Sequence, residues 1–439
     1  MTRSFRIVGA ALVAWACAVA SFPVQVRAAT LTEYAAPRHG ARMRPAAPAP
    51  ALLAAATIRP ASDGSDQTDA LQGALNALQV GQTLVLAPGR YTVSRSLSVA
   101  TSGVVVSGYG ATLVATNPSD QTIVMSGAGS TLVGVTLVGT GTTRLTTPAS
   151  TKVEVTGTGV QVLGVTIEGG ASAGIFVFGG SNVAIVGNTV NATLADGIHM
   201  TYGSTNVLVR GNTVTATGDD LIAVVSYLGD GRISSNVLID HNAVSGNAWG
   251  RGIAVVGGRA VTISNNTVDG VQKAAGILVA QEDSWRTYGA SNVVIDSNVV
   301  THIQNSTVNN GLQPTQQAAL ELDTWSGTVS YVTVTRNRVT GSGYSGFRAL
   351  GNVCEFEVEG NTFASIAGTA VSLLSSGCTA SRIVAGGNTL DGVALVRPVG
   401  ASSSGTIPAA GAVTTEMPQV RTALMQSSGS AAPATGAAR

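Results

Sequence analysis

Short alternating runs of hydrophobic and polar residues recur along most of the chain. A typical run is Val207-Leu208-Val209, which is soon followed by Gly211-Asn212. An asparagine follows most such runs, at Asn188, Asn212, Asn242, Asn266, Asn298, Asn337, Asn361 and Asn388. The spacings share a base of 24 residues, which insertions lengthen at some steps. Alternation over three or four residues predicts β-strands, and the recurring period indicates a repeat architecture.

A second alternating run follows each asparagine by about ten residues. These second runs are anchored at Ile198, Ile222, Ile253, Ile277, Leu320, Phe347 and Val371, with an earlier copy at Ile175. Two or three such short strands cannot form a core alone, but stacked coils bury their inward side chains against one another. Propeller blades need about 40 residues, and leucine-rich and helical repeats have other signatures. We therefore predict an all-β fold, a right-handed parallel β-helix over residues 58–398 with 24-residue coils, roughly ten in number.

Two local patterns complete this prediction. Stacked asparagines at one turn of every coil favour a structural hydrogen-bonded ladder over a functional role. The segment 66–78 places Ala70, Leu71, Ala74 and Leu75 on one helical face. This spacing predicts a short N-terminal helix that caps the open end of the solenoid.

The two ends of the chain differ from the repeats in composition. Arg3 and Arg6 precede an apolar run from Ile7 to Ala20, which is typical of a secretory signal peptide over residues 1–28. Residues 29–57 are rich in Ala and Pro, and residues 399–439 are mostly small or polar. Such segments bury too little surface to offset the entropy of ordering, so we expect a disordered linker and a disordered tail. The protein is expected to be secreted or periplasmic, without a membrane span.

Composition excludes several classes of protein. Of the 439 residues, 11% are charged and 44% are hydrophobic, which excludes an intrinsically disordered chain. The 54 glycines and the many Val and Thr residues argue against a helix-rich enzyme. The net charge of +1 argues against nucleic-acid binding, which requires a basic face. We expect a monomer with no nucleic-acid partner.

Two cysteines remain after the predicted signal peptide. Cys354 and Cys378 each lie seven residues past a strand anchor, Phe347 and Val371, so they occupy one column of adjacent coils. Neighbouring strands place Cα atoms about 5 Å apart, which is within the range for a disulfide. Export to an oxidising compartment favours the bridge, and two stacked buried thiols are the alternative.

The same register brings carboxylates together. Asp196 and Asp220 fall in one column, 24 residues apart, and Asp219 is next to Asp220. Arg251 takes the same column one coil further on. Carboxylates this close raise one another's pKa, so an acid and a base could stand side by side, as glycoside hydrolysis requires. Arg251 is either a cation that keeps an aspartate ionised or part of an ordinary salt bridge.

Insertions near these aspartates supply candidate substrate-binding residues. Extra residues fall around 225–235, 280–291 and 302–315, where loops would wall a groove on one face of the solenoid. Exposed aromatic rings suit the apolar faces of sugars, and ordinary loop packing is the alternative for each. The candidates are Tyr202, Tyr227, Glu282, Asp283, Trp285, Asp323 and Trp325, with His199 on the outward side of its strand.

Sequence motifs add a family resemblance. The opening DGSDQTDALQGALNAL, followed by LVLAPGRY, resembles the start of the pectate-lyase-like superfamily of carbohydrate-active β-helices. The motifs ADGIHM (195–200) and TGDDLIAVVSY (217–227) resemble the first two motifs of polygalacturonase-type glycosidases. The resemblance implies inverting hydrolysis, with Asp219 as the general acid and with Asp196 and Asp220 as the pair that activates water.

The same resemblance has gaps that bear on the substrate. Trp249-Gly250-Arg251-Gly252 replaces the Gly-His-Gly motif, and the Arg-x-Lys pair that grips a substrate carboxylate is missing. The aspartate pattern also resembles that of the α-1,3-glucanase (mycodextranase) family, which implies a neutral glucan.

Three functions remain open at this stage. The first is a secreted polysaccharide hydrolase that acts on a neutral glycan and needs no cofactor or metal. The second is a lyase or epimerase of uronic acids, with Ca²⁺ on the aspartates and Arg251 as the base. The third is a non-catalytic glycan-binding β-helix, in which the aspartates would be a turn feature or a cation site.

Overall fold

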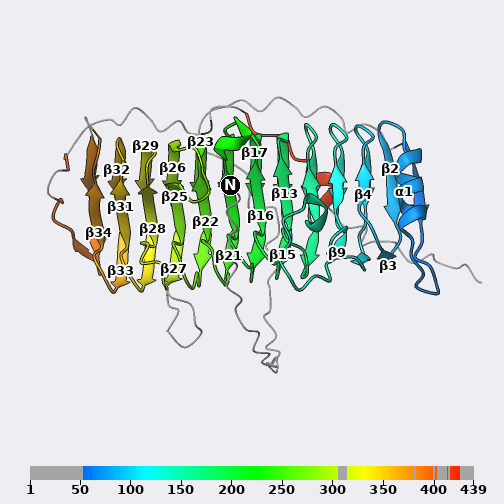
Figure 1. Cartoon of the computed structure of the whole chain (residues 1–439), viewed down its shortest axis with the longest axis horizontal. Helices are drawn as coiled ribbons and strands as arrows, with labels where there is room; N and C mark the ends of the chain where they lie inside the picture. Colours follow the sequence, from blue (N-terminus) through cyan, green and yellow to red (C-terminus); the bar gives the residue numbers. More distant parts are fainter. Residues whose placement is uncertain are drawn as a thin grey trace, which may run out of the picture. The chain divides into compact units, whose positions relative to one another are not determined.

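The chain forms a parallel β-solenoid built from three long sheets. The structure is a computed structural model that describes residues 53–304, 314–378, 382–398, 401–402, 413 and 416–425. The sheets contain 13, 11 and 13 strands, and Figure 1 shows the strands of successive coils side by side. The predicted parallel β-helix is confirmed. It has more than the roughly ten coils expected, because the first coils lack the asparagine, with Val165 in its place one coil before Asn188.

Most coils contribute one strand to each sheet, in the order A, B, C. Sheet A comprises β1 (Leu53–Ile58), β2 (Gln82–Leu86), β5 (Val105–Ser107), β8 (Thr131–Val133), β11 (Gln161–Leu163), β14 (Ser181–Val186), β17 (Thr205–Arg210), β20 (Ser235–Asp240), β23 (Gly258–Ser264), β26 (Ala290–Asp296), β29 (Val329–Thr335), β32 (Phe356–Glu359) and β35 (Ile383–Gly386). Sheet B comprises β3 (Gly89–Val93), β6 (Ala111–Ala115), β9 (Thr136–Val138), β12 (Thr166–Glu168), β15 (Thr189–Asn191), β18 (Thr213–Thr215), β21 (Ala243–Ser245), β24 (Thr267–Asp269), β27 (Val299–Ile303), β30 (Arg338–Ser342), β33 (Thr362–Ile366), β36 (Thr389–Leu390) and β37 (Val393–Ala394). Sheet C comprises β4 (Leu97–Val99), β7 (Ile123–Met125), β10 (Val153–Val155), β13 (Ile175–Phe178), β16 (Ile198–Thr201), β19 (Ile222–Val225), β22 (Ile253–Val256), β25 (Ile277–Gln281), β28 (Leu320–Thr324), β31 (Phe347–Gly351) and β34 (Val371–Ser375).

Strand register follows the predicted anchors. In sheet C, Ile198 pairs with Ile222, which pairs with Ile253, and this column of inward side chains continues through Ile277 and Leu320. These anchors belong to one buried hydrophobic cluster that continues through the coils. Since each coil buries its inward residues against the next, the 24-residue period and the core have the same cause.

The asparagine ladder is present as predicted. Asn212 is fully buried, and its Nδ2 donates to Oδ1 of Asn242 over 2.9 Å and to the backbone oxygen of Ile185. The same side-chain bond joins Asn188 to Asn212 and recurs along the ladder to Asn388. The ladder satisfies buried backbone groups at the turn from sheet A to sheet B, which is a structural role.

The N-terminal end is closed by a helix, as the spacing of apolar residues predicts. Helix α1 (Thr68–Ala77) buries Leu71 and Leu75, which meet Leu84 and Leu97 of the first coil. Strand β1 begins at Leu53, inside the segment 29–57 that composition predicts as a linker. Its backbone pairs in parallel with β2, so the sheet extends before residue 58.

The remaining predictions on the ends meet different outcomes. Residues 1–52, with the predicted signal peptide, lie outside the described residues. Within the predicted tail, residues 416–425 pack on sheet A and include the short 3-10 helix η5 (Thr422–Met425). Cys354 and Cys378 form a disulfide with Cα atoms 5.6 Å apart. Among the described residues, no helix has the length and apolar character needed to cross a membrane.

Candidate active site

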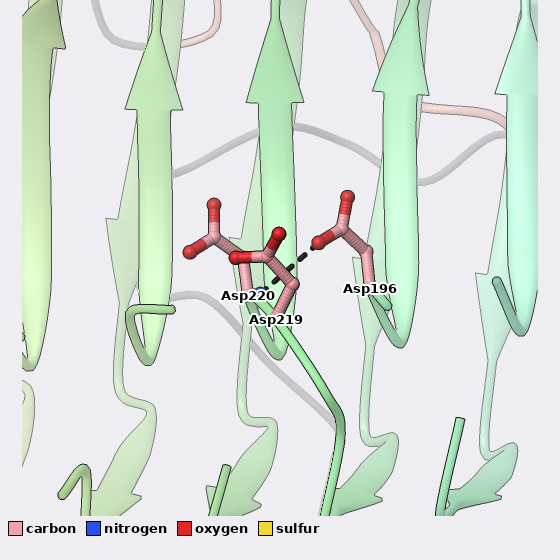
Figure 2. Close-up of side chains that lie close together, drawn as sticks. All are labelled: Asp196, Asp219 and Asp220. Carbon is pink, nitrogen blue, oxygen red and sulfur yellow. Dashed lines mark hydrogen bonds between the residues drawn. The ribbon is translucent and has the colours of Figure 1, made fainter. Parts of the chain in front are cut away.

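The candidate catalytic aspartates lie on two successive turns from sheet B to sheet C. Asp196 lies between β15 and β16, and Asp219 and Asp220 lie between β18 and β19. One carboxylate oxygen of each lies within 4.8 Å of the others. Figure 2 shows the three side chains close together at the starts of neighbouring strands. The repeat register therefore gathers the three residues, as the sequence predicts.

Small residues and hydroxyl groups hold these turns in shape. The Oγ1 of Thr217 donates to the backbone oxygen of Asp219 over 2.7 Å, and Thr193 makes the equivalent bond one coil earlier. A Cβ on Gly218 would come closer than 3.0 Å to the backbone oxygen of Leu194. The close approach of two adjacent turns thus requires the glycine of the Gly-Asp-Asp sequence.

Hydrogen bonds tie Asp196 to both of its neighbours. Its Oδ1 accepts the backbone N–H of Asp220 over 3.0 Å, the bond drawn in Figure 2. Its Oδ2 lies 2.6 Å from Nδ1 of His199. The His199 ring is 5% exposed and stacks on Phe176, with centroids 4.9 Å apart. His199 lies in the outward column of β16, as predicted, where its buried ring orients Asp196; a contact with substrate stays a prediction.

Two arginines pair with the other carboxylates. The backbone N–H of Arg251 donates to Oδ1 of Asp220 over 2.6 Å, and its guanidinium lies 3.6 Å from the same oxygen. That guanidinium also pairs with Glu282. On the other side of the cluster, Nη1 of Arg144 donates to Oδ2 of Asp219 over 2.6 Å. The cluster is therefore held between two cations.

Burial and mutual repulsion shift the protonation of the cluster. Burial raises the pKa of Asp220 to about 8, with Arg251 opposing this shift. Burial also raises the pKa of Asp219, to which the charge of Asp196 adds and which Arg144 opposes. At neutral pH the cluster consequently retains a proton that it can donate. Burial raises the pKa of Tyr227 to about 12, and the charges of Asp196 and Asp220 contribute, so this hydroxyl stays protonated beside the cluster.

The turn that carries Arg251 also fixes the carboxylates. A Cβ on Gly250 would come closer than 3.0 Å to both Asp219 and Asp220. Trp249 is 54% exposed, with Nζ of Lys273 lying 3.1 Å from the centre of its ring. The Trp-Gly-Arg-Gly segment thus packs its glycine on the aspartates and leaves an aromatic ring exposed beside them.

The other candidate binding residues lie at different distances from the cluster. The two inserted loops contact each other, because Tyr227 forms an antiparallel bridge with Thr287. Trp285 and Trp325 are 61% and 72% exposed, on loops after β25 and β28. The Oγ of Ser326 donates to Oδ1 of Asp283 over 2.5 Å, so Asp283 takes part in a contact between the loops after β25 and β28. The expected insertion at 302–315 lies largely in the undescribed residues 305–313.

Further polar residues flank the site on the outer face of sheet C. Tyr202 stacks on Phe178 with ring centres 4.1 Å apart, and the guanidinium of Arg232 covers it. Asp323 lies on β28, where burial raises its pKa. Next to it, Glu321 is fully buried and paired with Arg348.

Arg144 is the site residue that sequence reasoning missed. It belongs to the segment between β9 and β10, which also contains the 3-10 helix η2 (Pro148–Ser150). Buried Lys152 closes this segment, and its Nζ donates to the backbone oxygen of Val138 over 2.9 Å. The signal available in the sequence was the longer spacing from Val135 to Val165, 30 residues in place of 24.

A divalent cation fits this cluster poorly. The three aspartates alone offer a suitable set of oxygen ligands. However, Arg144 already pairs with Asp219 and Arg251 lies against Asp220, so a cation would have to compete with both.

Fold and site together define a parallel β-helix with a carboxylate cluster on one face. The family described as "Right handed beta helix region" matches residues 97–268 and 226–363. The chain belongs to this family. No curated protein matches the sequence.

Solved structures share the fold at low sequence identity. The catalytic domain of a GH87 α-1,3-glucanase, as an aspartate-to-alanine variant in complex with tetrasaccharides, is 16% identical, covers 78% of this chain and 70% of its own, and has a TM-score of 0.58. The catalytic unit of the thermostable GH87 α-1,3-glucanase from Streptomyces thermodiastaticus strain HF3-3 is 20% identical, covers 75% and 66%, and has a TM-score of 0.54. Dettilon tailspike protein (gp208) is 15% identical, covers 72% and 68%, and has a TM-score of 0.52.

Proposed function

We propose that the protein is a glycoside hydrolase that cleaves a neutral polysaccharide. The observation that carries the proposal is the cluster of Asp196, Asp219 and Asp220, in which one oxygen of each lies within 4.8 Å of the others and burial raises the pKa of Asp219. Hydrolysis of a glycosidic bond needs a proton donor and a proton acceptor at one place, and this cluster supplies both.

The surroundings of each carboxylate suggest its role. The side chain of Asp219 is 17% exposed and its pKa is raised, so it donates a proton to the leaving glycosidic oxygen. Asp196 is 14% exposed and takes a proton from the attacking water, and the oxygen of that water adds to the anomeric carbon. Asp220 is 8% exposed, donates its backbone N–H to Asp196, and positions that residue. The net result is one bond hydrolysed and one proton moved from Asp219 to Asp196.

Single displacement fits these contacts better than a covalent intermediate. Both oxygens of Asp196 already accept hydrogen bonds, and Asp220 is nearly enclosed, so neither offers a free oxygen to a bulky anomeric carbon. Two-carboxylate inverting sites are usually separated by about 6.5–9.5 Å. In this three-carboxylate cluster, which is tighter, the water would bind beside Asp196 instead of between the acid and the base.

The aspartate spacing supports the proposal independently. Three of the similar α-1,3-glucanase structures carry single aspartate-to-alanine substitutions and contain tetrasaccharides or nigerose. The substituted positions in that enzyme are separated by 23 residues and by 1 residue. Asp196, Asp219 and Asp220 have the same separations. This agreement favours an α-1,3-glucan as the first substrate to test.

A neutral glycan is favoured because three arginines of this face are already paired. Arg144, Arg251 and Arg348 each contact a carboxylate of the protein. A uronic acid would need a free cation to hold its carboxylate.

An elimination mechanism at this site would use Arg251 as its base. Burial lowers the pKa of Arg251, but the charges of Asp220 and Glu282 outweigh burial and raise it, so Arg251 stays protonated. A protonated Arg251 supports hydrolysis over a lyase or epimerase that would use Arg251 as its base.

We also propose that the protein acts outside the cytoplasm. The predicted signal peptide at residues 1–28 supports export. The disulfide between Cys354 and Cys378 suits an oxidising compartment.

The test is product analysis with a panel of neutral and acidic glycans. Hydrolysis predicts new reducing ends, no absorbance of an unsaturated product and no loss of activity in chelator. Proton NMR of the first product should show the inverted anomer. Unsaturated product that disappears in chelator would replace the proposal with a lyase, and binding without any product would replace it with a glycan-binding role.

A further inference from the structure

The outer face of sheet A changes character along the solenoid. One outward column runs through Ser107, Val133, Leu163, Val186, Arg210, Asp240, Ser264 and Asp296. Its positions from β8 to β14 are apolar, and those from β17 onward are polar or charged. A column exposed to solvent along its whole length is not expected to be apolar on three successive coils. The change in the same column therefore indicates that the first part is covered.

The covered part is an apolar strip. It comprises Val105, Val133, Leu163, Ala184, Val186 and Leu208, all of which are buried although they face outward. Residues 416–425 pack on this strip through Met417, Val420, Leu424 and Met425. Those four side chains are half-buried, whereas Thr422 and Ala423 between them are exposed. The segment thus places one apolar face on the strip.

Polar contacts set the register of this packing. The Nε2 of Gln161 donates to the backbone oxygen of Gln419 over 2.8 Å, and its Oε1 accepts the backbone N–H of Arg421 over 2.9 Å. The hydroxyl of Tyr109 donates to the backbone oxygen of Leu424 over 2.6 Å. Gln161 is 6% exposed beneath the segment, and both of these hydrogen bonds join its side-chain amide to the segment backbone.

The chain approaches the strip along the same sheet. Ser402 forms a parallel bridge with Val384 of β35, near the last coil. Further on, the backbone N–H of Val413 donates to Thr262 of β23. Residues 402, 413 and 417–425 therefore contact coils that are progressively closer to the N-terminal end, which is consistent with docking on the same molecule.

We propose that the apolar strip is a docking site for the chain's own residues 416–425, which act as a strap across the coils from β5 to β17. In a solenoid each coil contacts only its neighbours, so stability is a sum of local terms. A strap that contacts β5, β8, β11, β14 and β17 together joins these coils into one cooperative unit. It also covers an apolar surface that would otherwise favour aggregation.

Hydrogen–deuterium exchange of full-length variants tests the strap. The first variant carries Val420→Asp and Leu424→Asp on the apolar face, and the matched control carries Thr422→Asp and Ala423→Asp on the exposed face. In the wild type and the control, the amide of Arg421 should exchange at least about tenfold more slowly than in a free peptide of residues 416–425. In the first variant this protection should disappear, and exchange in β8 and β11 should accelerate.

A substitution on sheet A and a dilution series complete the test. Gln161→Ala should also release the segment, and combining it with the first variant should add nothing further. The protection of the Arg421 amide should not change when the protein is diluted, and the protein should sediment as a monomer. The proposal is wrong if the wild-type segment exchanges like the free peptide, if both faces respond equally, or if protection is lost on dilution together with a dimer.

Discussion

At the scale of single residues, a nearby cation and burial shift the pKa values of the cluster in opposite directions. Arg144 pairs with Asp219 and lowers its pKa against the effect of burial. Asp220 is enclosed and its pKa is raised to about 8. Burial thus raises the pKa of both aspartates, and a cation from a distant loop opposes this shift at Asp219.

Removing Arg144 should change the pH dependence of activity. In Arg144→Ala the pKa of Asp219 rises further, so the acid stays protonated to higher pH. We expect the alkaline limb of kcat/KM to move upward by about one pH unit, and Arg144→Lys to restore part of the original profile. Arg210→Ala, which breaks an ion pair with Asp240 on sheet A, should leave the profile unchanged.

Asp220 should make stability depend on pH. Its pKa in the folded chain, about 8, lies above the value of 3.8 for an ordinary aspartate, so the native state binds more protons between these pH values. The free energy of unfolding therefore falls as pH rises through this window. Asp220→Asn should remove this pH dependence. Between pH 4 and pH 8, the free energy of unfolding of the variant should rise relative to that of the wild type by on the order of 2 kcal/mol. Denaturant unfolding of both proteins at pH 4 and at pH 8 measures this difference. An equal difference at the two pH values would contradict the raised pKa of Asp220.

At the scale of elements, the turns from sheet B to sheet C carry the site. Sequence periodicity could predict the column of Asp196 and Asp220, because both lie a fixed number of residues before paired strands. It could not predict Arg144, whose contact with Asp219 spans 75 residues and depends on an insertion outside the period. It placed His199 correctly on the outward side of its strand but could not reveal that Asp196 and Phe176 cover the ring.

The turn at Gly250 should tolerate no side chain. In Gly250→Ala the new Cβ would collide with Asp219 and Asp220, and displacing either carboxylate by an ångström costs catalysis heavily. We expect a loss of roughly 100-fold in kcat with little change in glycan binding. Gly229→Ala, in the 3-10 helix η3 (Leu228–Asp230) where a Cβ meets open space, is the matched control. Equal activity of the two variants would show that the cluster is not held from this side.

At the scale of the whole molecule, a solenoid should unfold locally at its ends. The last coils are held by the disulfide between Cys354 and Cys378, which closes a loop with a sequence separation of 24 residues. Such a loop contributes about 3 kcal/mol by constraining the unfolded chain. The interior coils depend on their own neighbours and on the asparagine ladder.

Loss of the disulfide should therefore have a local effect. In the variant with Cys354→Ser and Cys378→Ser, hydrogen exchange should accelerate in β34 and β35 and remain unchanged in β16 and β19. Uniform acceleration along the chain would contradict the nearest-neighbour description of stability.

Hydrolysis of glycosidic bonds by Asp219, with Asp196 and Asp220, is best tested by the rate of reducing-end release from α-1,3-glucan. The full chain is compared with Asp219→Asn and with Asp230→Asn, a nearby control outside the cluster. We expect at least a 1,000-fold loss for Asp219→Asn, with retained glycan binding and a normal rate for Asp230→Asn. Undiminished release by Asp219→Asn would contradict this expectation.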